Sequence, residues 1–126
     1  MSRLILDAGA FIGFEKGDAA VRDRIAVARK RSIQLATTSP VIAQTWRDGR
    51  RQVLVARLVA ATKVDAPDDV AAKRAGELLA ITGTADVVDA LLVALARDGD
   101  VILTSDPDDI EPLVVAAGIR ATVFAI

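Results

Sequence analysis

Residues 3–8 read Arg-Leu-Ile-Leu-Asp-Ala and join an uninterrupted apolar run to a single acid, Asp7. Apolar runs without polar alternation are typical of strands covered on both faces, as in a parallel sheet. The ligand sites of such sheets lie beyond the carboxyl ends of the strands, which is the position that Asp7 takes. From this stretch alone Asp7 has two open interpretations, a cap for the following helix or a member of a functional site.

The same pattern returns near the C-terminus. Residues 101–104 read Val-Ile-Leu-Thr and are followed by Ser105 and Asp106. Asp109 comes shortly after, at the start of a helix, where a capping role and a site role are equally open. Because the carboxyl ends of parallel strands meet at one edge of a sheet, we expect Asp106 to lie near Asp7.

A third acidic element lies between these strands. Residues 85–96 have the length of a helix and only two polar side chains, Asp86 and Asp89. A helix that is apolar all round belongs in the interior, where a lone carboxylate must be paired, act as a cap or bind a cation. Asp86 follows Thr84 and can also be explained by the helix dipole, whereas Asp89 lies one turn further in, where that explanation weakens.

The remaining sequence alternates helices with short strands. The expected helices cover residues 9–16, 18–31, 38–61, 67–81, 85–96 and 108–117, with Gly49 a candidate break in the third, and the expected strands cover residues 3–8, 32–37, 63–66, 101–104 and 121–126. In the first helix, Phe11, Ile12 and Phe14 are expected to face the core. This order predicts a single domain over residues 1–126 with an α/β fold, a three-layer α/β/α sandwich around a mostly parallel sheet.

Composition restricts the possible chemistry. The 126 residues include no His, Cys or Tyr, so thiol and imidazole catalysis, zinc–thiolate sites and disulfides are excluded. Any catalysis must rest on carboxylates, hydroxyls, Lys or Arg. No apolar run approaches the roughly 18 residues that span a bilayer, and we expect a soluble, cytoplasmic protein without a membrane role. The hydrophobic content of 52% is high for a solvated monomer and indicates that a partner covers some apolar surface.

Cations gather in the middle of the chain, although the formal net charge of the whole is −1. Between residues 41 and 64 the only acid is Asp48, and the cations are Arg47, Arg50, Arg51, Arg57 and Lys63. Guanidinium groups bind phosphate bidentately, and a positive strip attracts an anionic polymer. An ordinary solvated helix face is the alternative interpretation of the same residues.

Taken together, the acids predict a metal site. The carboxylates that are expected to converge above the sheet are Asp7, Asp86, Asp89, Asp106 and Asp109. Carboxylates brought together raise one another's pKa and are tolerated chiefly by a divalent cation. All-oxygen ligation favours Mg²⁺ or Mn²⁺, and such ions support hydrolysis of phosphodiesters without histidine.

Three short motifs resemble those of the PIN-domain ribonucleases, particularly the VapC toxins of VapBC toxin–antitoxin pairs. They are Leu-Asp-Ala at Asp7, Val-Asp-Ala-Leu-Leu at residues 88–92 and Leu-Thr-Ser-Asp at residues 103–106, and their order and spacing match over essentially the whole chain. The resemblance implies Mg²⁺- or Mn²⁺-dependent endonucleolytic cleavage of RNA, a homodimer, and a cognate VapB-like antitoxin that covers the active-site groove. It further implies that the metal ligands are Asp7, Asp89 and Asp106, joined by Asp86 or Asp109, and that Arg47, Arg50, Arg51 and Arg57 hold phosphates of the RNA.

One position departs from this family pattern. Domains of this kind usually carry a glutamate on the helix after the second strand, and the matching residue here is Gln44. Glutamine can coordinate a metal through its carbonyl oxygen but supplies no charge, so weaker metal binding, compensation by Asp86 and loss of activity are all open. Thr104 and Ser105 resemble positions where hydroxyls assist the site, and ordinary hydrogen bonding at the end of a strand is the other interpretation.

Two further function classes compete with the nuclease. Gln44 motivates a catalytically weak or inactive PIN-like module that binds RNA or a protein partner. A phosphotransfer domain, either a response-regulator receiver or a haloacid-dehalogenase-like phosphatase, also places an Asp after a parallel strand. The receiver needs a Lys after a later strand, which this chain lacks, and the phosphatase needs a second Asp where Gly9 stands.

Overall fold

Residues 2–126 are described by a computed structural model and contain seven helices and five strands. The strands are β1 (Arg3–Leu6), β2 (Gln34–Thr38), β3 (Lys63–Asp65), β4 (Val101–Thr104) and β5 (Thr122–Ala125). The helices are α1 (Ala8–Lys16), α2 (Ala19–Lys30), α3 (Ser39–Thr45), α4 (Val53–Ala60), α5 (Asp69–Thr82), α6 (Val87–Leu95) and α7 (Pro107–Ala117).

All five strands form one parallel sheet in the order β3-β2-β1-β4-β5. β1 lies at the centre, where Ile5 is in register with Ala36 of β2 on one side and with Ile102 of β4 on the other. All four residues of β1 are buried, which is why this strand carries no polar alternation.

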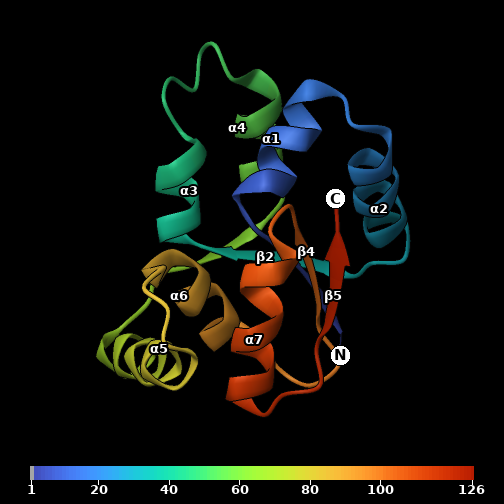
Figure 1. The fold of residues 1–126 in the computed structure, drawn as a ribbon. Helices are drawn as coiled ribbons and strands as arrows, with labels where there is room; N and C mark the ends of the chain where they lie inside the picture. Colours follow the sequence, from blue (N-terminus) through green and yellow to red (C-terminus); the bar gives the residue numbers. More distant parts are fainter. Residues whose placement is uncertain (1) are drawn as a thin grey trace.

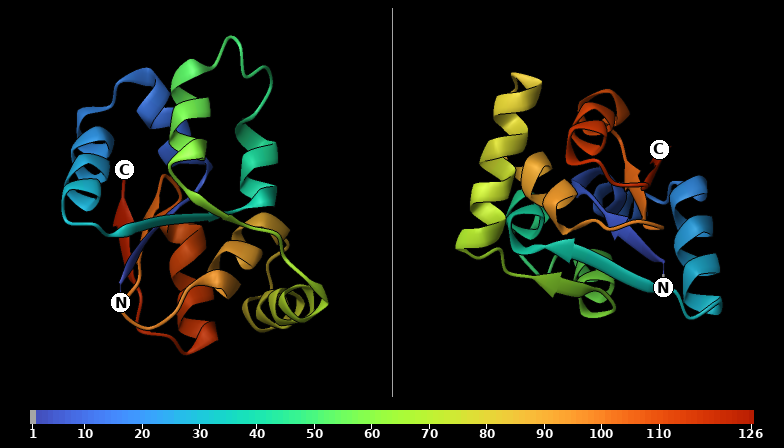
Figure 2. Two further views of the ribbon diagram at one scale, coloured as in Figure 1. Left: turned by 180° about the vertical axis from the view of Figure 1, so that it is seen from behind. Right: turned by 90° about the horizontal axis from the view of Figure 1, so that it is seen from below.

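The helices cover both faces of the sheet. Helices α1 to α4 lie on one face and α5 to α7 on the other, so the molecule has three layers (Figures 1 and 2). The chain winds from β1 outward to β3 through the first group, and from β4 to β5 through α7 on the opposite face. Because crossover connections between parallel strands are right-handed, connections that proceed in opposite directions across the sheet place their helices on opposite faces. The expected three-layer α/β/α sandwich is confirmed.

The core lies on both sides of the central strands. Phe11 of α1 fills one side, and Leu92 of α6 and Ile110 of α7 fill the other; each of these side chains is fully buried. At the amino-terminal end of the sheet the buried Arg3 pairs with Asp100, whose carboxylate lies 2.7 Å from the guanidinium. Burial on its own raises the pKa of Asp100, but the hydrogen bonds from Arg3 and from the backbone of Arg97 bring that pKa below its ordinary value.

Some expected boundaries and one expected orientation were wrong. Ile12 is 40% exposed, because a helix of nine residues presents only one face to the sheet, and Phe11 occupies that face. The candidate break at Gly49, in contrast, is confirmed: residues 46–52 separate α3 from α4, and a Cβ at Gly49 would lie 2.6 Å from the ring of Trp46. Helix α6 begins at Val87 instead of residue 85, because the side chain of Asp86 caps it.

Within residues 2–126 no single helix is long and apolar enough to cross a membrane; α5 and α6 meet the composition test only as a pair, bent by 115° at their junction.

Candidate active site

The two central strands end at the point where the winding of the sheet reverses. The chain leaves β1 towards β2 and leaves β4 towards β5, so the connections after these neighbouring strands diverge (Figure 1). Such a divergence opens a crevice beyond the carboxyl ends of the strands, where ligands bind in open α/β sheets. Asp7 is the first residue after β1, and Asp106 is the second residue after β4, so both acids lie at this crevice.

A cavity of about 430 Å³ opens there. Its lining residues are Asp7, Ala8, Gly9, Ile12, Val41, Gln44, Arg47, Asp86, Asp89, Ser105 and Asp106. The structure thus brings together four of the five predicted acids with Gln44, Arg47 and Ser105. Asp109 does not line this cavity, and neither do Thr104 or the other arginines of the predicted RNA-binding strip.

Asp7 caps α1, which is one of the two roles that its sequence left open, and it also lines the cavity. One carboxylate oxygen accepts a hydrogen bond from the backbone N–H of Ala10 at 3.0 Å and caps α1. The other oxygen accepts one from the N–H of Ser105 at 3.3 Å, which joins the ends of β1 and β4. Burial raises the pKa of Asp7, and this effect prevails over hydrogen bonds from Thr104, Ala10 and Ser105 that favour the charged form.

Asp106 keeps its carboxylate free for the cavity. It stands at the N-cap position of α7, but its side chain makes no capping hydrogen bond. Its backbone N–H donates to the buried Thr104 hydroxyl at 2.9 Å, and the Ser105 hydroxyl lies 3.5 Å from its Oδ2 atom. Thr104 therefore holds the turn that presents Asp106, and its predicted accessory role becomes one of positioning.

Asp86 and Asp89 are one turn apart at the start of α6, and they differ in role. Asp86 accepts a hydrogen bond from the N–H of Asp89 at 3.0 Å, so it is the cap of α6 as well as a cavity residue. The carboxylate of Asp89 is half-buried among other acids. Burial, and then the negative charges of Asp86, Asp7, Asp106 and Asp109, raise the pKa of Asp89 from 3.8 to about 7.

The acids therefore act on one another through space, even where they make no direct contact. Asp109 contributes to the raised pKa of Asp89 although it does not line the cavity. The predicted role of Asp109 as a ligand stays a prediction, and the structure shows only that its charge reaches Asp89. Negative charges gathered around a half-buried carboxylate are the environment in which a cation would be stabilised.

Gly9 is a residue of the site that the sequence interpretation missed. A Cβ atom at this position would lie 2.3 Å from the Ser105 hydroxyl oxygen and 3.2 Å from the Asp7 carboxylate. Any side chain here would separate the start of α1 from the β4–α7 turn and so move Asp7 away from Asp106. The signal in the sequence was a glycine two residues after a strand-ending acid, which permits the close approach of backbone to a site.

Gln44 of α3 and Arg47, which follows α3, also line the cavity. Arg47 is held in place by hydrogen bonds from its guanidinium to the carbonyl oxygens of Ala43 and Trp46, at 2.9 and 2.8 Å. The Gln52 side-chain oxygen accepts from the backbone N–H of Arg47 at 2.7 Å, which braces the loop. The loop 46–52 therefore presents its cations from a defined conformation.

The other predicted RNA-binding arginines lie further out. Arg50 and Arg51 are on the same loop and exposed, and Arg51 lies 3.8 Å from the carboxylate of Asp48. Both side chains of that pair are largely in solvent, so the pair contributes little to stability. Arg57 is exposed on α4.

The donor set fits a hard divalent cation. The cavity offers carboxylate, amide and hydroxyl oxygens, with no nitrogen or sulfur ligand, as Mg²⁺ and Mn²⁺ prefer. In residues 2–126 no three acids stand close enough together to enclose a metal directly. Mg²⁺ usually retains several waters and uses one or two carboxylates, so a spread set of acids around a cavity of this size suits a partly hydrated ion.

Comparison with known proteins identifies the fold. No family model matches the chain, and none of the curated proteins matches it. Among solved structures, a chain in DNA-bound VapBC from Salmonella typhimurium has a TM-score of 0.71 and 19% identity, with 98% of each chain covered. A chain in VapBC2 from Rickettsia felis, bound to a DNA fragment from their promoter, has a TM-score of 0.68 and 10% identity, covering 96% of this chain and 98% of that one. The chain therefore has the PIN-like α/β/α fold, as its motifs predicted, and shares it with proteins of VapBC complexes.

Proposed function

We propose that this protein is a Mg²⁺- or Mn²⁺-dependent endoribonuclease and the toxin of a type II toxin–antitoxin pair. The observation that carries the proposal is the cavity at the switch point of the sheet, where acids from β1, α6 and the β4–α7 turn line one space. The pKa of Asp89, which is raised first by burial and then by the charges of the neighbouring acids, supports a cation there. The shared fold with chains of VapBC complexes supports the toxin role.

In this proposal Asp7, Asp89 and Asp106 would hold a partly hydrated ion, in part through its waters, and Asp86 and Asp109 would add negative charge around it. When bound, Mg²⁺ or Mn²⁺ supplies a Lewis acid that stabilises the charge developing on a phosphodiester during hydrolysis.

The cations around the cavity would bind the RNA backbone. Arg47, fixed by its two carbonyl contacts, would face the phosphate next to the cleaved bond. Arg50, Arg51 and Arg57 would extend the contact along the strand, with an affinity that falls as salt rises.

We further propose a VapB-like antitoxin as partner, a homodimer as the assembled form and the cytoplasm as the compartment. An antitoxin with a cationic side chain could neutralise the acidic cavity directly, because the site repels its own charges at neutral pH. Exposed apolar side chains such as Trp46 and Val64, which line one hollow with residues of α3 and α4, are surface that a partner or second copy would cover.

The decisive experiment is cleavage of total RNA by the purified protein with Mn²⁺, with Mg²⁺ and with EDTA. Asp7→Asn is the informative variant, because its amide oxygen can still cap α1 while the charge is removed. We expect metal-dependent cleavage by the wild type and none by Asp7→Asn, with circular dichroism showing both folded. Glu77→Gln, which removes an exposed carboxylate of α5, serves as the control and should cleave normally. Cleavage that persists in EDTA or in Asp7→Asn would refute a metal nuclease.

The second candidate is a PIN-like module that binds RNA or a protein without cutting, and Gln44 favours it. This neutral side chain lines the cavity where a further charge would strengthen metal binding. A wild type that binds RNA but never cleaves it with Mn²⁺, together with cleavage by Gln44→Glu, would support this alternative.

A further inference from the structure

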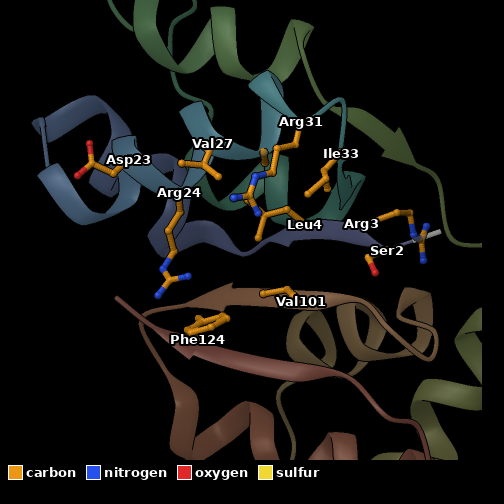
Figure 3. Close-up of a pocket in the computed structure, with 11 residues that line it drawn as sticks. Ser2, Arg3, Leu4, Asp23, Arg24, Val27, Arg31, Ile33, Val101 and Phe124 are labelled. Carbon is orange, nitrogen blue, oxygen red and sulfur yellow. The ribbon is translucent and has the colours of Figure 1, made fainter.

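A second hollow lies on the α2 side of the sheet and shares no lining residue with the acidic cavity. It has a volume of about 350 Å³ and lies between α2 and the first residues of β1 and β4, with Phe124 of β5 at its far side (Figure 3). The space stays open because α2 packs against β2, while α7, which packs against β5, lies on the opposite face of the sheet. We call this feature the α2 hollow.

The walls of the α2 hollow are largely apolar. The apolar residues that line it are Leu4, Val27, Ala28, Ile33, Val101 and Phe124. Val27 is 48% exposed although it lies beside these apolar neighbours (Figure 3). Small-molecule sites are typically concave, with volumes of about 300 Å³ or more, mostly apolar walls and a few polar groups that orient the ligand. The hollow therefore has the size and the character of a site for the apolar part of a small ligand.

Two arginines give the α2 hollow a positive charge. Arg24 and Arg31 both line it, and within residues 2–126 neither of them makes a salt bridge. Arg3 also lines the hollow, but it is paired with Asp100. The unpaired acid of the lining is Asp23, whose side chain points away from the hollow (Figure 3). The uncompensated charge in the hollow is therefore positive, and its ligand should carry a negative charge.

Phe124 holds the side chain of Arg24 in position. The central carbon of the guanidinium lies 3.7 Å from the centroid of the ring. Such a contact uses the face of the guanidinium and leaves its N–H groups, which lie in its plane, able to donate two hydrogen bonds to a carboxylate. Because the side chain is already ordered, less conformational entropy is lost when an anion binds. Arg24 is therefore a prepared anion-binding group at the apolar wall.

From these features we infer that the α2 hollow binds a small amphiphilic carboxylate, a molecule with one carboxylate and an apolar chain. The carboxylate would bind Arg24, and the charge of Arg31 would add to the attraction. The apolar chain would lie against Leu4 and Val27. One ligand can reach both kinds of group, because residues 24, 27 and 31 are spaced to lie on one face of α2. The inference goes beyond the proposed nuclease and does not depend on it, because none of these residues lines the acidic cavity.

The test uses octanoate as the probe, with octanamide and octylammonium as controls that keep the apolar chain and change the charge. In NMR titrations of the full chain, octanoate should cause saturable shifts of the amides of Val27, Ala28, Val101 and Phe124. Octanamide should bind about tenfold more weakly, because it lacks the charge that Arg24 binds, and octylammonium should leave these amides unshifted. Equal affinity for octanoate and octanamide, or shifts that do not saturate, would overturn the proposal.

The length of the chain measures how much of the ligand the hollow buries. Between hexanoate, octanoate and decanoate, each added CH₂ group that is partly or fully buried should strengthen binding by about two- to fourfold. An affinity that does not change with chain length would show that the protein binds the carboxylate alone, and this result would also overturn the proposal.

Val27→Glu locates the site. It places a carboxylate three residues after Arg24 and four residues before Arg31, the spacings at which charged side chains on a helix form pairs. This built-in carboxylate should compete for the arginines and weaken octanoate binding by about tenfold or more, while α2 stays folded because the position is half exposed. The matched control is Ala26→Glu, which makes the same change of charge at a neighbouring exposed position that does not line the hollow. It should bind octanoate as the wild type does, and an equal loss in both variants would indicate a diffuse charge effect and overturn the proposal.

Other occupants would give different results. If vesicles of phosphatidylglycerol bind the wild type but not Val27→Glu, and octanoate causes no shifts, the hollow binds a membrane surface and the proposal is wrong. If Val27→Glu dissociates a dimer in analytical ultracentrifugation, and octanoate again causes no shifts, the hollow binds a second copy of this chain, which would likewise overturn it.

Discussion

Asp89→Asn should stabilise the metal-free protein at alkaline pH and leave its stability unchanged at acidic pH. The pKa of Asp89 is raised to about 7 in the folded chain, first by burial and then by the charges of Asp86, Asp7, Asp106 and Asp109. A raised pKa means that the folded state binds the proton more tightly than the unfolded state. Ionisation of Asp89 therefore costs stability, and this cost develops as the pH rises from about 4 to about 7.

The size of the effect follows from the same pKa. A rise from 3.8 to about 7 would be worth at most about 4 kcal/mol, at about 1.4 kcal/mol per pH unit. Asp89 is only half-buried, so solvent screening reduces this upper limit, and we expect about 2 kcal/mol. For a chain of this size that is a difference in Tm of about 5 to 10 °C at pH 8.

Thermal unfolding followed by circular dichroism in EDTA, from pH 4 to pH 9, measures this difference. Wild type and Asp89→Asn should have similar Tm values near pH 4, and the variant should be the more stable above pH 7. Glu77→Gln controls for the loss of an exposed carboxylate and should follow the wild type throughout. Added Mg²⁺ should raise the Tm of the wild type at pH 8 more than that of Asp89→Asn, because a bound cation removes the repulsion.

Two results would refute this reasoning. A constant Tm difference between wild type and Asp89→Asn at all pH values would show that the substitution acts through packing and not through charge. A gain at pH 8 that Glu77→Gln matches would show that net charge, and not the cavity, is responsible.

Three further predictions concern single residues. Gly9→Ala should lower the free energy of unfolding by about 1–3 kcal/mol in urea titrations, because a Cβ would lie 2.3 Å from the Ser105 hydroxyl; a neutral effect would show that the turn yields easily. Gln44→Glu should bind Mn²⁺ at least about tenfold more tightly in isothermal titration calorimetry, since it adds a charge to the cavity wall, and unchanged affinity would place Gln44 outside the metal's reach. Asp100→Ala should lower the free energy of unfolding by about 3–5 kcal/mol in urea titrations at pH 7, because the buried Arg3 loses its partner. Since the pKa of Asp100 is lowered in the folded protein, this loss of stability should shrink as the pH falls below about 4. A loss that does not change with pH would contradict this explanation.

The sheet and two of its acids were predictable because the information is local. An uninterrupted apolar run determines a covered strand, and the residue after it must lie at the edge of the sheet. The sequence therefore predicts that Asp7 and Asp106 lie at one edge of the sheet, and the structure places both in one cavity. The break around Gly49 was predictable because it too depends on local sequence: a glycine in a helical pattern weakens the helix.

Properties that depend on the packing of distant segments were not predictable. Ile12 has the apolar character of a core residue, but the position of α1 on the sheet leaves it 40% exposed at the cavity. Asp109 and Asp106 are three residues apart, yet the start of α7 turns only Asp106 into the cavity. A hollow of about 350 Å³ on the α2 side of the sheet combines residues from α2, β1, β4 and β5, and no local pattern marks it.

The sequence by itself determined the parallel α/β fold, the absence of imidazole and thiol chemistry, and the acids at the strand ends, because each of these follows from residue type and short-range periodicity. The tertiary structure decided which acids line the same cavity and how their hydrogen bonds and pKa values change as a result. Asp7 both caps α1 and lines the cavity because β1 and β4 end side by side, with the Ser105 N–H between them. The pKa of Asp89 is raised to about 7 first by burial and then by the charges of neighbouring acids, and three of these, Asp7, Asp106 and Asp109, lie on other elements; both effects depend on distance in space and not in sequence.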